Sequence, residues 1–299
     1  MRRSARRGKV LKKWMASGLA MLALSACGGG GRDFPFTGGI NQPFTGTAQF
    51  IDSPVKGLAY TSGELVGVTD ADGAFDYAAG KPVIFSVGNT VIGQVTLERS
   101  DNSLYITPVD LVADAEAETD TSVANIARLL QSLDDDRDAE NGITITEAMH
   151  AAADEDIDIS ALSNSAFQNY VSYFETLMAL GSSGITDLVT AADAQAHLKS
   201  VLLERLAGTY QGTFTDTEDN SGTFTLTVDA SGDITGTAID DEGQSSTLSG
   251  QTSSDRSAVV DGSDVGVEFS GRISKDGEFS GVWENVSLGE SGAFTGTRQ

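Results

Sequence analysis

A short unit, made of an apolar residue, a polar residue and glycine, recurs through the last third of the chain. It occurs at Tyr210–Gly212, Ile234–Gly236, Leu248–Gly250, Phe269–Gly271, Phe279–Gly281 and Phe294–Gly296. Turn signals rich in Asp and Gly lie between the units, for example at Ser231–Asp233 and Asp241–Gly243. Short strands of even spacing joined by such turns predict an up-and-down antiparallel meander. Because glycine lets a strand bend or a neighbouring ring cover it, we expect residues 207–299 to form a barrel or a sandwich.

The N-terminus carries an export signal. Seven Lys or Arg residues and no acidic residue precede the apolar run Met15–Leu24. This run leads into Ser25, Ala26 and Cys27. This pattern is typical of a lipoprotein signal peptide, which is cut before a cysteine that carries diacylglyceryl and palmitate chains. An ordinary secretory signal or a short membrane span is the alternative, but the run is shorter than the about 20 residues that a span needs. We predict residues 1–26 as the signal and Cys27, the only cysteine, as the lipid attachment site.

The residues after the cysteine indicate where the protein is held. Gly28 stands in place of the aspartate that commonly retains lipoproteins in the inner membrane, which favours the outer membrane and leaves the leaflet open. Residues 27–43 are rich in glycine and contain prolines, so we predict a flexible tether. The predicted partner of this part of the chain is the membrane, reached through the lipid.

Removing residues 1–26 leaves a strong polyanion. Twelve Lys and Arg then face 43 Asp and Glu, which gives a formal net charge of −31. Nucleic acid is therefore not expected as a partner, because contacts to phosphates need cations that are scarce here. A solvated acidic surface and a preference for cationic ligands both remain open.

Residues 44–118 show short β-rich runs that alternate with Gly, Pro and Asp turns, which predicts an antiparallel β-sandwich module. Within it, Val66–Tyr77 resembles the strand, turn and strand of carboxypeptidase-regulatory-like, transthyretin-like β-modules. Asp70 and Asp72 shape the turn in that resemblance, and cation binding is the alternative role for them.

Three further segments resemble envelope lipoproteins of uncharacterised function. They are Ile106–Leu111, Asn125–Asp134 and Asn141–Ile143, and the resemblance spans residues 44–147. It implies a β-module followed by helices, and it implies no activity. With the C-terminal meander, the expected fold class is α+β with several domains.

Residues 119–206 are predicted as a helical segment with an acidic loop. Ile126, Leu129, Leu130 and Leu133 repeat at helical spacing after a cap at Thr121 or Ser122. The acids that follow at alternate positions resemble the first half of a calcium loop. The candidate ligands are Asp134, Asp136, Asp138, Asn141, the Ile143 carbonyl and Glu147. The glycine expected after Asp138 is replaced by Ala139, so a solvated acidic helix end is the alternative to calcium.

The motifs of common enzymes are not present. There is no Gly-x-Ser-x-Gly elbow, Walker loop or His-Glu-x-x-His, and the two histidines, His150 and His197, lie in separate stretches. Among 43 acids no glycosidase pair stands out. We therefore expect a non-enzymatic binding or structural module that takes a protein or glycan at the envelope. The alternative is a carrier whose barrel holds a small apolar or glycan ligand, with Trp283 either in the core or lining a cavity.

Overall fold

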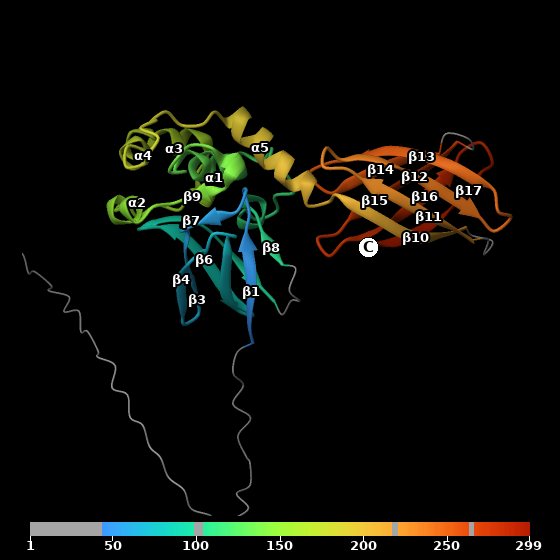
Figure 1. Cartoon of the computed structure of the whole chain (residues 1–299), viewed down its shortest axis with the longest axis horizontal. Helices are drawn as coiled ribbons and strands as arrows, with labels where there is room; N and C mark the ends of the chain where they lie inside the picture. The colour runs from blue at the N-terminus through green and yellow to red at the C-terminus, as the bar shows by residue number, and fades with distance from the viewer. Residues whose placement is uncertain (1–43, 99–103, 217–220, 263–265) are drawn as a thin grey trace, which may run out of the picture. The chain divides into compact units, whose positions relative to one another are not determined.

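The computed structural model describes residues 44–98, 104–216, 221–262 and 266–299. The predicted signal, Cys27 and the predicted tether lie outside these ranges. The described chain is mostly β, with helices in its middle and a barrel at its C-terminus (Figure 1). The prediction that the chain combines strands and helices and has a C-terminal β-barrel or sandwich is therefore confirmed. No helix within the described ranges combines the length and the apolar character needed to cross a bilayer.

Two small sheets make up the N-terminal part. Their strands are β1 (Thr45–Phe50), β2 (Val55–Lys56), β3 (Ala59–Ser62), β4 (Leu65–Val68), β5 (Ala74–Ala78), β6 (Lys81–Val87), β7 (Thr90–Leu97) and β8 (Tyr105–Ile106), with the later β9 (Ile143–Thr144). One sheet has the order β5-β1-β8 and the other β4-β3-β6-β7, while β2 pairs with β9. The Phe85 ring lies 4.8 Å from that of Phe50 and 5.0 Å from that of Phe75, so the two sheets share one core.

This part is not purely antiparallel, in contrast to the prediction. The pairs β1–β8 and β2–β9 are parallel. A parallel pair needs a long crossover connection between its strands. The chain between β2 and β9 includes the helix α1. The β2–β9 pair therefore joins the predicted β-module, residues 44–118, to the predicted helical segment, residues 119–206.

The helical elements are short. They are α1 (Thr121–Ser132), α2 (Glu147–Ala152), α3 (Asn164–Gln168), α4 (Val171–Met178) and α5 (Ala191–Glu204), with the 3-10 turns η1 (Pro108–Leu111), η2 (Ala139–Asn141) and η3 (Ile159–Ala161). The predicted stripe Ile126, Leu129, Leu130 and Leu133 is fully buried in the same core as the sheets. The cap of α1 is Asp120, not Thr121 or Ser122, because the Asp120 Oδ1 accepts from two backbone N–H groups of the first turn.

Residues 208–298 form a closed barrel of eight antiparallel strands in chain order, which settles the choice between barrel and sandwich (Figure 1). Its strands are β10 (Gly208–Asp216), β11 (Ser221–Val228), β12 (Asp233–Asp240), β13 (Ser245–Thr252), β14 (Ser257–Gly262), β15 (Val267–Ile273), β16 (Glu278–Asn285) and β17 (Glu290–Arg298). The first strand, β10, pairs with the last, β17, so the sheet has no free edge.

The recurring glycines make room for rings inside the barrel. A Cβ at Gly212 would lie 2.6 Å from the Phe224 ring, and one at Gly271 would lie 2.7 Å from the Phe294 ring. The apolar residue and the glycine of each unit are two positions apart, so they share one face of the strand. Large rings therefore fill the space over glycines of other strands inside the barrel, as the sequence pattern predicted.

Candidate functional site

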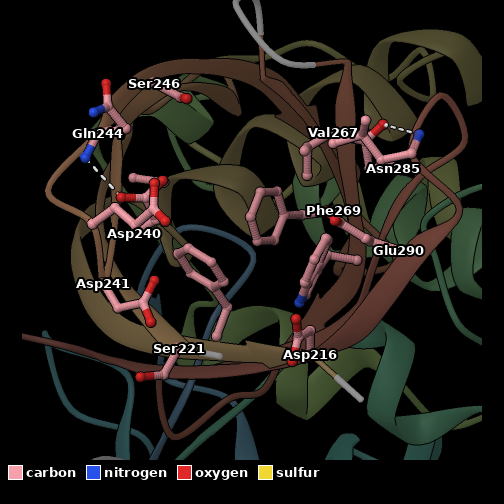
Figure 2. A pocket seen from close by; sticks show the side chains of 15 residues that line it. Asp216, Ser221, Asp240, Asp241, Gln244, Ser246, Val267, Phe269, Asn285 and Glu290 are labelled. Atoms are coloured by element: carbon pink, nitrogen blue, oxygen red, sulfur yellow. Dashed lines mark hydrogen bonds between the residues drawn. The ribbon is translucent and has the colours of Figure 1, made fainter. Parts of the chain in front are cut away.

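The barrel interior is packed at one end and open at the other. At the packed end the Phe279 and Phe294 rings lie 4.7 Å apart, and the fully buried Tyr210 ring lies 6.3 Å from Phe279. At the open end lies a cavity of about 340 Å³ (Figure 2). Ligand pockets in proteins usually measure about 300–1,000 Å³, so this one suits a small ligand.

Three aromatic rings form the floor of the cavity. The Phe214 ring lies 5.8 Å from that of Phe269 and 5.9 Å from that of Trp283, in edge-to-face contacts with interplanar angles of 79°. Phe269 lies near the centre of the ring of strands in Figure 2. Trp283 is only 7% exposed and also lines the cavity, so it is both a core ring and a cavity ring.

The orientation of the Trp283 indole is fixed by the strand pairing. Its Nε1–H donates to the Thr215 carbonyl at 3.0 Å. The indole can approach because Gly292 pairs with Trp283 and carries no side chain, and a Cβ there would lie 2.6 Å from Nε1. A buried indole N–H normally finds such a partner. This bond and the Gly292 contact fix the indole plane of Trp283 in the floor.

The rim of the cavity is acidic. Among the described residues, five carboxylates line it, from Asp216, Asp240, Asp241, Glu242 and Glu290, and none of the described lining residues is Lys, Arg or His. In Figure 2, Asp216, Asp240, Asp241 and Glu290 are spread around the opening. The acids come from three separate places in the sequence, which the up-and-down topology brings to one end of the barrel.

Hydrogen bonds within the turns hold this rim in place. The Asp240 Oδ1 accepts from the Gln244 N–H at 2.7 Å across the β12–β13 turn, where Gly243 has a φ of 81°. The Asn285 Oδ1 accepts from the backbone N–H groups of Ser287 and Leu288 at 3.1 and 3.3 Å. Such side-chain bonds to nearby backbone are typical of ordered turns.

The predicted calcium loop is a turn built on two adjacent carboxylates. The Asp134 side chain is buried, and its Oδ1 accepts from the Thr144 N–H at 2.8 Å. Its Oδ2 is buried without a hydrogen-bond partner. Burial raises the pKa of Asp134 to about 6, and the nearby Asp136 carboxylate adds to the rise. The hydrogen bond from the Thr144 N–H lowers this pKa and offsets part of the rise. The Asp136 carboxylate accepts from the Asn141 Nδ2 at 3.1 Å, which lowers its pKa.

The other candidate ligands do not complete a site. Asp138 and Glu147 are exposed, and Ile143 lies in β9, where its N–H donates to the Pro54 carbonyl at 3.0 Å. Within the described ranges, no three His, Cys, Asp or Glu side chains gather where they could hold a metal. The structure therefore joins Asp134, Asp136 and Asn141, and it does not join the full predicted set.

The left-handed turn of this loop lies at Arg137 instead of the position after Asp138. Arg137 has a φ of 66°, which is unfavourable for a residue with a side chain. Its guanidinium donates to the carbonyls of Ser132 at 2.7 Å and Asp187 at 2.6 Å. These bonds hold the residue in place, and they explain why Ala139 is tolerated where the calcium-loop pattern has glycine.

Asp70 takes the predicted turn role. Its Oδ1 accepts from the N–H groups of Asp72 at 2.9 Å and Ala74 at 2.8 Å. Gly73 has a φ of 74°. Turn formation by Asp70 and Gly73 is thereby confirmed, and Asp72 supplies a backbone donor to it.

Both ring nitrogens of each histidine lie within hydrogen-bonding distance of other protein groups. His150 accepts from the Gly88 N–H at 3.0 Å through Nδ1, and its Nε2 lies 2.7 Å from the Gly57 carbonyl oxygen. His197 lies between Ser53 and Glu140, with Nε2 3.1 Å from the Ser53 Oγ and Nδ1 3.2 Å from the Glu140 Oε1. Sequence analysis missed this group because its members are far apart in the chain.

A hydroxyl, an imidazole and a carboxylate are hydrogen-bonded in this order through Ser53, His197 and Glu140. Acyl-transfer enzymes use the same order of groups. Such an enzyme also needs N–H donors for the oxyanion and a pocket for the acyl group. The Glu140 side chain is 83% exposed, so solvent screens its bond to His197. We interpret the group as a structural contact between the turn after β1 and helix α5.

A buried carboxyl group lies next to this contact. Asp52 is fully buried, and the Gln131 Nε2 lies 3.2 Å from each of its carboxylate oxygens. Burial raises the pKa of Asp52 to about 7, while the charge of His197 and the Gln131 bond act in the opposite direction. This raised pKa makes the stability of the N-terminal part dependent on pH.

Comparison with known protein families and with curated proteins finds no match to this chain.

Proposed function

We propose that this protein is an exported, lipid-anchored envelope protein whose C-terminal barrel binds a small ligand without chemical conversion. The cavity at the open end of the barrel carries this proposal. It has an aromatic floor and a polar rim, which is the usual composition of a small-ligand site. It favours the carrier function over a module that binds only proteins or glycans. Residues 44–118 are proposed as a transthyretin-like β-module, and the two N-terminal sheets with their shared core support its β-rich character.

Dye binding tests the cavity. The chain from Gly28 to Gln299 has Trp283 as its only tryptophan, because the other is Trp14. The uncharged dye N-phenyl-1-naphthylamine should bind saturably and quench Trp283. Ser246→Phe, at the cavity wall, should weaken binding about tenfold or more by a steric clash. Ser249→Phe, on the exposed face of the same strand, is the matched control. Equal dye affinity in both variants, or no saturable binding, would refute a ligand site here.

Lipid anchoring is tested at the cysteine. Cys27→Ser removes the thiol that takes the lipid, so the variant should leave the membrane fraction, or stay as an uncleaved precursor. Without acyl chains, the about 0.8 kcal/mol that each buried CH₂ contributes to membrane affinity is lost. Cell fractionation with metabolic labelling by palmitate measures both effects. Unchanged labelling in the variant would contradict lipid attachment at Cys27, and Ser25→Ala is a control that keeps the thiol.

A calcium ion in the acidic loop is a second candidate, and the unpartnered Asp134 Oδ2 favours it. A cation between Asp134 and Asp136 would give that oxygen a partner and reduce the repulsion of two adjacent carboxylates. Asn141 would join through its side-chain oxygen after rotating away from Asp136.

Calcium at about 100 times its Kd should raise the Tm of the Gly28–Gln299 chain by about 5 °C. Changing Asp134, Asp136 and Asp138 to Asn should abolish the rise. The matched control changes Asp154, Glu155 and Asp156, which are exposed, to their amides. A rise that survives in the loop variant, or no rise in the parent chain, would leave the loop as an acidic turn.

A further inference from the structure

The charge of the barrel opening limits what the cavity can accept. The five rim carboxylates surround an opening whose floor is apolar, and no lining residue in the described part of the barrel carries a positive charge. A concave site with low-dielectric walls concentrates the field of such charges. Anionic ligands are therefore repelled, and cations are concentrated at the mouth.

The floor of the cavity distinguishes between kinds of cation. Hard metal ions need six or more oxygen ligands around one point, and among the described rim residues no three acids gather where they could hold a metal. Alkylated ammonium ions are weakly hydrated and are attracted to aromatic faces, which carry negative potential. Phe214, Phe269 and Trp283 supply three rings in one cluster beneath the acidic rim.

The hydrogen-bonding character of the site agrees with such a ligand. The Trp283 indole N–H is already donated to the Thr215 carbonyl, so the floor offers rings and no indole donor. The Asp241 and Glu290 side chains are exposed at the rim, where their oxygens can face an incoming charge. The β16–β17 turn adds the exposed Leu288, an apolar contact beside the carboxylates.

From this combination we infer that the barrel selects an organic ammonium cation with alkyl substituents, held over the three rings and neutralised by the rim acids. This inference rests on the proposed ligand-binding function and specifies the class of ligand. The ammonium group can belong to a free small molecule or to a lipid headgroup.

A charged ligand and its neutral analogue of the same shape test the inference. Choline carries a quaternary ammonium nitrogen where 3,3-dimethylbutan-1-ol carries a neutral carbon. Trp283 fluorescence of the Gly28–Gln299 chain reports the binding of each compound. Choline should bind at least about tenfold more tightly, which corresponds to about 1.4 kcal/mol. The double variant Asp241→Asn and Glu290→Gln should reduce this preference about fivefold or more. The double variant Asp276→Asn and Glu278→Gln makes the same charge change at the opposite end of the barrel and should leave it unchanged.

The outcomes separate the inference from the proposed function. If the neutral analogue and N-phenyl-1-naphthylamine bind as well as choline, the site is an apolar pocket and the ammonium inference is wrong. If neither choline nor the dye binds, the proposed function itself fails. Phosphatidylcholine vesicles, with phosphatidylglycerol vesicles as the control, distinguish the sources. Binding of choline alone assigns a free ligand, and binding of choline and of phosphatidylcholine vesicles assigns a lipid headgroup.

Discussion

Gly212→Val is expected to destabilise the barrel by about 3 kcal/mol. A Cβ at this position would collide with the backbone of β17, at the Thr295 carbonyl oxygen, and with the Phe224 ring. No rotamer relieves a clash with a paired strand, so β10 and β17 would have to separate where they close the barrel. Urea unfolding of the Gly28–Gln299 chain, followed by Trp283 fluorescence, reports on the barrel alone.

Thr213→Val is the matched control for this change. Thr213 follows Gly212 on the same strand and is exposed, and valine has the same shape as threonine and a high preference for strands. Its urea midpoint should stay close to that of the parent chain. If Gly212→Val unfolds at the same urea concentration as Thr213→Val, ring packing over the glycines does not stabilise the barrel.

Asp52→Asn is expected to remove most of a pH dependence worth up to about 4 kcal/mol, because one pKa unit corresponds to about 1.36 kcal/mol. The pKa of Asp52 is raised from 3.8 to about 7 in the folded chain. Between these values the folded state holds a proton that the unfolded state has released. Stability therefore falls as pH rises from about 4 to about 7, and it stays low above that range. Asparagine resembles the protonated, uncharged group, so the variant should be more stable than the parent at pH 8.

Thermal unfolding by circular dichroism at 222 nm, measured from pH 4 to pH 8, tests this prediction. The helices that give this signal lie in the N-terminal part with Asp52. The charge of His197, which is bonded to Glu140, acts on Asp52, so the quantity to compare is the difference between variant and parent. Asp76→Asn, at an exposed carboxylate that accepts from the Thr47 hydroxyl at 2.9 Å, is the control. Parallel curves for Asp52→Asn and the parent would show that Asp52 is ionised in the folded protein.

The barrel could be predicted from sequence because the patterns that specify its strands and turns lie within short stretches of the chain. Each apolar residue and glycine two positions apart mark an inward face, and the Asp-Gly turns mark the strand ends. The stripe of α1 is local for the same reason. The cap of α1 was misplaced by one or two residues, because Asp120, Thr121 and Ser122 are all good caps and only backbone geometry selects among them.

A cavity lined by Trp283 was one of two alternatives, but its other lining residues could not be predicted, because they depend on register around the whole barrel. Phe214, Phe269 and Trp283 lie on three strands, and only the closed pairing places them at the same height above the packed end. Asp216, Asp240 and Glu290 end or begin strands that are far apart in sequence. Their meeting follows from strand lengths, which turn signals fix to within one or two residues at best. The Ser53, His197 and Glu140 contact needs the packing of α5, which no local pattern contains.

The closure of the barrel also has a consequence for engineering. The Gln299 N–H donates to the Thr209 carbonyl at 2.9 Å, so the last residue and the start of β10 lie side by side at the end opposite the cavity. In a barrel separated from the chain before Gly208, joining these two ends and opening the chain between the exposed Ala230 and Ser231 would give a circular permutant, since neighbouring ends and exposed turns tolerate such rearrangement. The cavity mouth contains neither the old junction nor the new ends. A fluorescent or affinity fusion at the C-terminus should likewise leave the mouth open to ligand.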